Sequence, residues 1–181
     1  MTSGWLQRMA ACGAAAVVLV APPAPAEIRV TPVVANGRVA VSFSLPTALG
    51  PDVRELVESG LLMTLAFTVD LKAPSALWFD RTIAHVDLSS SVKYDNLTGV
   101  HHVSRMRDGH VTWSERTSRY ADAQAWLTTF ERVVIAEDSQ LQPNGEYDIQ
   151  VRMRSRPRRT FPLWPWTSDD AGGRATFTFI R

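Results

Sequence analysis

Alternation of apolar and polar side chains at every second residue limits the fold of this chain more than any other feature of the sequence. Successive side chains of a β-strand point to opposite faces, so this pattern is typical of strands that bury one face. It recurs over residues 28–45, 61–71, 79–94, 147–154 and 175–179. The pattern therefore predicts a protein built mainly from antiparallel strands.

The first alternating stretch has Asn36-Gly37 at its centre. This pair favours a two-residue type I′ turn, because both central residues need a positive φ. The turn places all apolar side chains on one face through the pairs Val34–Val39, Pro32–Val41, Val30–Phe43 and Ile28–Leu45. Since Pro32 has no N–H group to donate, we expect the first strand to lie at a sheet edge.

A second type I′ hairpin is predicted at Asp108-Gly109, between residues 99–107 and 110–116. Its simplest register gives the pairs Met106–Val111, Ser104–Trp113, His102–Glu115 and His101–Arg116. Helices are predicted between Pro51 and Gly60 and over residues 121–132. The second helix is indicated by the helical spacing of Ala123, Trp126, Leu127 and Phe130. A short strand is then expected over residues 133–136.

These elements predict a mainly β fold, an antiparallel β-sandwich or open barrel of about eight strands with two short helices at an end. No linker or repeat divides the chain after residue 26, so residues 27–181 are expected to form a single domain.

Residues 1–26 have the pattern of a secretory signal peptide. The segment carries one charge, Arg8, followed by an apolar run over residues 9–20 and by Ala24-Pro25-Ala26 before Glu27. The run is shorter than the ~20 residues of a membrane-spanning helix. We therefore expect a periplasmic or secreted protein after cleavage near Ala26, with an uncleaved N-terminal anchor as the alternative.

Cleavage would leave a chain without cysteine, since Cys12 is the only one. It would also lower the Lys and Arg count from 19 to 18, equal to the 18 Asp and Glu residues. An exported chain of zero net charge and no cysteine is not expected to bind nucleic acid, to form disulfides or to hold a thiolate-bound metal.

Several short motifs follow one another along the chain. They are Glu58-Ser59-Gly60, Trp78-Phe79-Asp80-Arg81, Tyr94-Asp95-Asn96-Leu97-Thr98-Gly99, His102-Val103-Ser104-Arg105 and Ala125-Trp126-Leu127. In this order they resemble, over residues 27–153, the bacterial exported-protein family known as domain-of-unknown-function family 4390. The resemblance implies no activity and no catalytic residue. It implies an envelope-signalling partner, since members are encoded beside a membrane-bound sensor kinase, which is an association and not a mechanism.

The stretch RSRPRRTFPLWPW, residues 154–166, has the most unusual composition in the chain. Three prolines exclude both a helix and a sheet ladder there, so we expect a loop. Three interpretations stay open: the tryptophans cover an end of their own sandwich, dock a protein partner, or touch an anionic membrane surface, the least favoured of the three. The candidate binding residues are Arg152, Arg154, Arg156, Arg158, Arg159, Trp164 and Trp166.

Catalytic and metal-binding patterns are weak in this sequence. His85 and Asp87 share the polar face of one strand, whereas His101 and His102 point to opposite faces. No spacing demands a metal, and we expect no metal and no other cofactor. The sequence also lacks a nucleophile elbow and paired carboxylates.

The sequence therefore favours a non-enzymatic binding or accessory module of the bacterial envelope that acts on another protein. The alternative is a hydrolase-like or metal-dependent enzyme with a site in the sandwich cleft near His85 and Asp87. A carbohydrate-binding module would need a planar row of exposed aromatic side chains, and the alternation points most of them inward.

Overall fold

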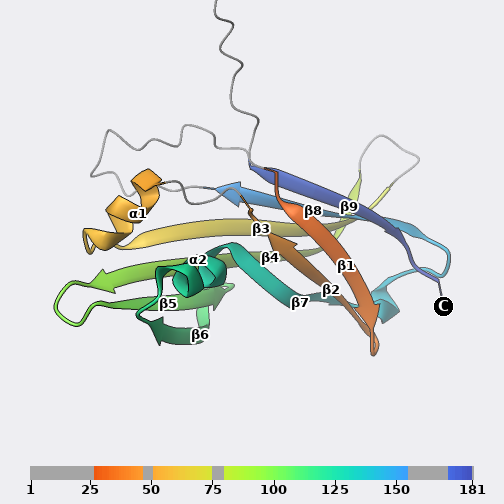
Figure 1. Ribbon diagram of the computed structural model, residues 1–181. Helices are drawn as coiled ribbons and strands as arrows, with labels where there is room; N and C mark the ends of the chain where they lie inside the picture. Colours follow the sequence, from red (N-terminus) through yellow and green to blue (C-terminus); the bar gives the residue numbers. More distant parts are fainter. Residues whose placement is uncertain (1–26, 47–50, 75–79, 155–170, 181) are drawn as a thin grey trace, which may run out of the picture.

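The structure is a computed structural model that describes residues 27–46, 51–74, 80–154 and 171–180. Within these residues the chain forms nine strands, two α-helices and one 3-10 helix (Figure 1). The strands are β1 (Arg29–Ala35), β2 (Arg38–Ser44), β3 (Met63–Ala73), β4 (Arg81–Asp95), β5 (Val100–Arg107), β6 (His110–Thr117), β7 (Thr129–Glu137), β8 (Glu146–Arg154) and β9 (Gly172–Thr178). The helices are α1 (Pro51–Glu58), α2 (Tyr120–Thr128) and η1 (Asp138–Gln140).

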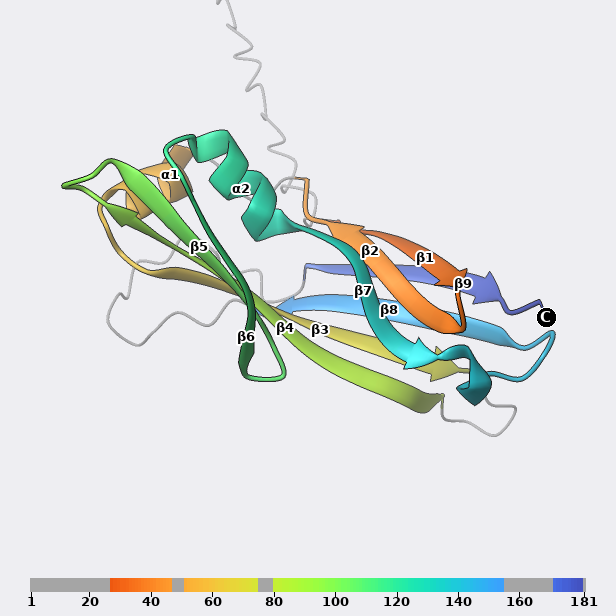
Figure 2. The ribbon, with the colours of Figure 1, turned by 90° about the horizontal axis from the view of Figure 1, so that it is seen from below.

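Two antiparallel sheets pack face to face. The smaller has the order β1-β2-β7 and the larger the order β6-β5-β4-β3-β8-β9, while α1 and α2 lie toward one end of the sheets (Figure 2). The predicted antiparallel sandwich is confirmed, with nine described strands where about eight were expected. The described strands do not close into a barrel.

The two sheets meet at one edge, between the start of β1 and the start of β9. Glu27 forms a parallel bridge with Gly172, and the Ile28 N–H donates to the Gly172 carbonyl at 3.2 Å. A Cβ atom on Gly173 would clash with the carbonyl oxygen of Ile28, so glycine permits this close approach.

The first hairpin forms as predicted. Asn36 and Gly37 have φ angles of 53° and 75°, as a type I′ turn requires. The register contains three of the predicted pairs, Val34–Val39, Pro32–Val41 and Val30–Phe43. β1 is the edge strand of the smaller sheet, as the missing N–H group of its proline predicted.

The second hairpin has its predicted turn, with φ angles of 49° at Asp108 and 83° at Gly109, and its predicted Met106–Val111 pair. A β-bulge between Arg105 and Met106 then shifts the register, so the other three predicted pairs are wrong. The observed pairs are Arg105–Trp113, Ser104–Ser114, His102–Arg116 and His101–Thr117.

The bulge has a packing reason, because it brings Arg105 opposite Trp113 on the inner face of the sheet. The guanidinium carbon lies 5.0 Å from the Trp113 ring centre and 4.8 Å from that of Phe130. The same group donates to the Trp126 carbonyl at 2.7 Å and to the Thr129 carbonyl at 2.5 Å. Burial lowers the pKa of Arg105 from its ordinary value.

The second helix ends four residues earlier than predicted. α2 stops at Thr128, and β7 begins at Thr129, so Phe130 belongs to a strand and not to the helix. Side chains of the larger sheet bind the last carbonyls of α2, since Ser90 Oγ donates to Leu127 O at 2.7 Å alongside the bonds from Arg105. These side chains bind carbonyl groups that a further helical turn would otherwise bind, so the chain can leave the helix and continue as a strand.

Two smaller boundaries also differ from the prediction. β3 begins at Met63, and Leu61, expected on its buried face, is 42% exposed. The same strand continues through Lys72 and Ala73, two residues beyond the alternating stretch 61–71. The predicted buried residues of this strand from Met63 to Leu71 are confirmed.

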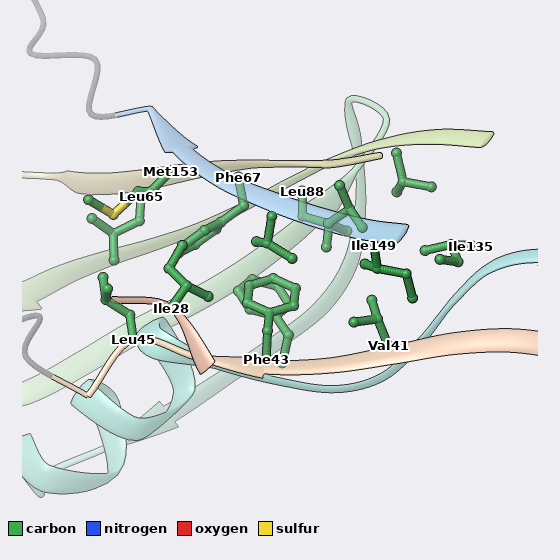
Figure 3. Packing of buried hydrophobic residues seen from close by; sticks show 14 of the residues in the cluster. Ile28, Val41, Phe43, Leu45, Leu65, Phe67, Leu88, Ile135, Ile149 and Met153 are labelled. Atoms are coloured by element: carbon green, nitrogen blue, oxygen red, sulfur yellow. The ribbon is translucent and has the colours of Figure 1, made fainter. Parts of the chain in front are cut away.

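Three phenylalanines join the two sheets. Phe67 comes from β3 and Phe43 from β2 (Figure 3), and Phe130 comes from β7. Phe43 stacks on Phe130 with ring centres 4.8 Å apart, and each lies 5.3 Å from the centre of Phe67. All three are at most 3% exposed, so this cluster is the middle of the core.

We expect Phe67→Ala to lower the free energy of unfolding by about 3–5 kcal/mol, because it leaves a cavity between two sheets that cannot collapse onto each other freely. Urea unfolding followed by circular dichroism measures this change. Val111→Ala, at a side chain that is 63% exposed, is the control and should change the value by less than about 0.5 kcal/mol. Equal effects of the two substitutions would contradict the central role of Phe67.

Candidate functional site

The structure describes two of the seven candidate binding residues predicted from the sequence. Arg152 and Arg154 lie in β8, opposite Thr68 and Ala66 of β3. The Arg152 side chain is on the outer face of the larger sheet and is 52% exposed. The other five, Arg156, Arg158, Arg159, Trp164 and Trp166, lie outside the described residues, and their roles stay predictions.

Arg152 belongs to a charged cluster that crosses three strands. Its guanidinium donates to Asp70 Oδ2 of β3 at 2.5 Å. On the other side, Nδ1 of His85 in β4 lies 2.7 Å from Asp70 Oδ1. The second ring nitrogen of His85 is 3.5 Å from Asp87 Oδ1. From the sequence, His85 and Asp87 were treated as a pair and Arg152 as a separate candidate. Asp70 connects them in one cluster.

The strand register explains why these side chains meet. Asp70 pairs with His85 on one side and with Gln150 on the other, while Thr68 lies between Asp87 and Arg152. All of them therefore point to the outer face, since neighbouring strands in register share side-chain direction. Asp70 itself is only 4% exposed, because the longer side chains beside it cover it.

Hydrogen bonds determine the charge states in this cluster. Burial acts to raise the pKa of Asp70, but the hydrogen bonds from His85 and Arg152 and their positive charges outweigh it, so this pKa lies below its ordinary value. The hydrogen bond with Asp70 raises the pKa of His85, burial opposes it, and the charges of Asp70 and Asp87 add to the rise. The arrangement thus favours an ionised Asp70 beside a protonated His85.

A second buried carboxylate repeats this arrangement on the neighbouring strand β8. Asp148 of β8 is 3% exposed and accepts hydrogen bonds from Arg174 and, at 2.5 Å, from Thr176 Oγ1. The hydrogen bond from Arg174 is the main cause that lowers the pKa of Asp148. The outer face of the larger sheet thus holds two arginines in place through buried acidic partners.

His85 and Asp87 lie on this outer face, 51% and 67% exposed, and not in the cleft between the sheets, where the alternative of an enzyme would place its site. Their predicted position on the polar face of the strand is confirmed. Asp87 also borders a shallow hollow of about 240 Å³, with Ser89 and Met106 among its lining residues. An imidazole oriented by a carboxylate can accept or donate a proton, so the site has the parts of an acid–base pair.

Sequence reasoning missed Asp70, although a signal was present. An aspartate is unusual at the centre of a strand as apolar as residues 63–71. The alternation placed Asp70 on the outer face, but only the register of β3 with β4 and β8 shows which cations it binds.

The remaining histidines do not gather with this cluster. His101 is buried between Tyr94 and Tyr120, with ring centres 4.6 Å and 5.9 Å away, while His102 is exposed, as their opposite orientation predicted. Among the described residues, no group of three or more His, Cys, Asp or Glu side chains is placed to hold a metal ion. Within the same residues, no helix has the length and apolar character to cross a membrane.

In the comparison with protein-family models, residues 26–164 match the family described as Domain of unknown function (DUF4390). The chain belongs to the DUF4390 family. This confirms the resemblance found in the sequence motifs. The match includes every strand from β1 to β8 and extends beyond β8 to Trp164, whereas β9 lies outside it. Comparisons with curated proteins and with solved structures gave no match for this DUF4390 chain.

We expect Asp70→Asn to lower the pKa of His85 toward its ordinary value of about 6.5, because the mutation removes the main hydrogen-bonded anion. NMR titration of the His85 ring measures this. Protonated His85 stabilises the fold below its ordinary pKa, and this stabilisation is lost as the pH rises through the raised value. Asp70→Asn should therefore also flatten the pH dependence of unfolding in that range.

Asp87→Asn is the matched control, since Asp87 is 3.5 Å from the other ring nitrogen and mostly exposed. It should lower the pKa of His85 less than Asp70→Asn does. A larger effect of Asp87→Asn would show that Asp70 is not the main partner of His85.

Proposed function

We propose that this DUF4390 protein is a non-enzymatic binding module of the bacterial envelope, exported from the cytoplasm, that acts on another protein. Its binding surface includes the outer face of the larger sheet around Arg152. The observation that carries the proposal is the half-exposed guanidinium of Arg152, fixed at 2.5 Å from the buried carboxylate of Asp70.

A fixed arginine suits protein recognition for a physical reason. Ordering a long side chain on binding costs about 0.5–1.5 kcal/mol, and the ion pair with Asp70 has already restricted Arg152 before a partner arrives. Arginine and tryptophan are also the residues that most often anchor protein interfaces. Arg152 and Arg154 lead directly into the sequence that contains Trp164 and Trp166. The association of the family with a sensor kinase supports a membrane-bound protein as the partner.

An enzyme is the second candidate, and the His85–Asp70 pair is the observation in its favour. A hydrolase would need a nucleophile or a substrate group beside the free ring nitrogen of His85. In the described structure that nitrogen faces Asp87 Oδ1 at 3.5 Å instead, and both residues lie on an open sheet face. We therefore rank the binding module first.

Arg152→Gln, and separately Trp164→Ser with Trp166→Ser, should each reduce recovery of the envelope protein that the wild type captures. The reason is the loss of anchor side chains, each worth about 2 kcal/mol or more at the centre of an interface. The measurement is affinity capture from envelope extract, quantified for each variant after circular dichroism confirms folding. Arg116→Gln, at an exposed arginine of β6, is the control and should capture the same protein as the wild type.

Undiminished capture by both folded variants would contradict the proposed binding surface. Equal loss with Arg116→Gln would indicate a general effect of positive charge instead of a specific site.

A separate prediction follows from the proposed export of the protein. The sequence before Glu27 has the small residues that signal peptidase requires, so the N-terminal residue of the protein isolated from the periplasm should be Glu27. Edman degradation or mass spectrometry of the intact protein measures this. Replacing Ala24 and Ala26 by bulky residues should leave the protein uncleaved, and a cytoplasmic protein that begins at Met1 would overturn the export proposal.

A further inference from the structure

The outer face of the smaller sheet is a second surface, separate from the one around Arg152. This sheet consists of β1, β2 and β7 and lies at the end of the molecule away from α1 (Figure 2). In the part of the chain that the structure describes, no other element lies over this face, and its residues Thr31, Ala35 and Arg38 are exposed. The described structure thus leaves the face open.

Three apolar side chains cross the middle of this face in register. Val33 of β1 lies opposite Ala40 of β2, and Ala40 lies opposite Val134 of β7. We call these three residues the apolar row. They line a hollow of about 450 Å³. Ala40 is only 8% exposed because it is shorter than the valines on both sides, so the middle of the row is lower than its ends.

An arginine lies on each side of the apolar row, and both line the same hollow. Arg38 is two residues before Ala40 on β2 and shares its face. Arg132 of β7 lies beside Ser42, two residues after Ala40, where its N–H donates to Ser42 Oγ at 3.0 Å. Among the described residues, neither arginine forms an ion pair, and no Asp or Glu lines this hollow.

The nearest acidic side chains leave these arginines unpaired. Glu137 lies opposite Arg38 in the register, and Glu131 precedes Arg132 along β7. Within the described part of the chain, neither carboxylate forms an ion pair with either arginine. The charge of Glu131 also interacts with Arg105 of the larger sheet. The hollow therefore keeps a positive charge that is complementary to an anionic partner.

The backbone at Arg132 has a conformation that an arginine does not favour. Its φ angle is 50°, in the left-handed region that suits glycine. The other described non-glycine residues with a positive φ are Asn36, Asp108 and Asn144, which lie in turns and are of the types that tolerate it. At Arg132 the cause is a β-bulge opposite Ser42, and bulges redirect side chains. An arginine at a position that suits glycine indicates that its side chain is used.

We propose that this hollow binds an extended acidic segment of a partner protein. One apolar side chain of the segment lies on the apolar row, and a carboxylate on each side of it pairs with Arg38 and with Arg132. This contact is on the sheet opposite to Arg152, so it goes beyond the protein-binding surface proposed above.

The spacing of the hollow supports an extended polypeptide as the occupant. Arg38 and Ser42 are four residues apart on one strand, which corresponds to about 13 Å. An extended segment has the same repeat, so its side chains i, i+2 and i+4 reach one arginine, the apolar row and the other arginine. A single phosphate or carboxylate would leave the apolar row unused.

The test measures binding of a fluorescein-labelled peptide to the full chain by fluorescence anisotropy. The peptide has glutamates two residues before and two residues after a central leucine, in a threonine background. We expect saturable binding that weakens as salt is added. A control peptide of the same composition, with both glutamates adjacent at one end, should bind at least about tenfold more weakly, since only one arginine can be paired.

Variants of the protein separate binding from folding. Arg132→Gly should weaken binding at least about tenfold without lowering Tm, because glycine suits the positive φ. Arg38→Gln should weaken binding to a similar extent. Arg116→Gln and Arg152→Gln, at exposed arginines of the larger sheet, are the controls and should bind the peptide as the wild type does. Circular dichroism measures Tm for each variant.

Absence of binding, equal binding of the two peptides, or an equal loss with Arg116→Gln would overturn the proposal. A lower Tm of Arg132→Gly with unchanged binding would show that this arginine serves the fold, and would also overturn it. Self-association of the wild type that Arg132→Gly removes, measured by light scattering, would identify a second copy as the occupant instead. The peptide measurement does not involve envelope capture, so failure of the proposed function leaves its outcome unaffected.

Discussion

The contact between Phe67 of the larger sheet and the stacked pair Phe43 and Phe130 of the smaller sheet holds this fold together. In the part of the chain that the structure describes, the backbone hydrogen bonds of the strands run within each sheet apart from the bridge at Gly172. Packing of side chains therefore sets how the two sheets lie against each other. Phe130 reaches this position because α2 ends at Thr128, where Ser90 and Arg105 bind its last carbonyls. The position of α2 and the middle of the core therefore depend on each other.

The core is held by apolar packing, whereas the outer face of the larger sheet contains ion pairs. Buried carboxylates are costly unless they are paired, and here Asp70 and Asp148 each hold cations that remain partly in solvent. This arrangement orders Arg152 and His85 without burying them. A surface prepared in this way is suited to recognition.

Much of the fold was predictable because its determinants are local. Strand alternation, the Asn36-Gly37 turn and the absent N–H group of Pro32 act within a few residues, and the first hairpin formed in the predicted register. The errors came where distant groups compete with local preference. The bulge at Arg105 allows this side chain to contact aromatic rings and to bind the end of α2. The helical periodicity of residues 121–132 did not reveal that Phe130 lies in a strand and packs against the larger sheet.

The candidate site was also predictable only in its local features. The sequence by itself determined that Arg152, His85 and Asp87 lie on polar faces of strands, because side-chain direction alternates with each residue. Only the tertiary structure decided that β3 lies between β4 and β8, which brings Asp70 into contact with both cations. The physical reason is that strand order and register depend on the packing of whole sheets, whereas the direction of a side chain depends only on its own strand.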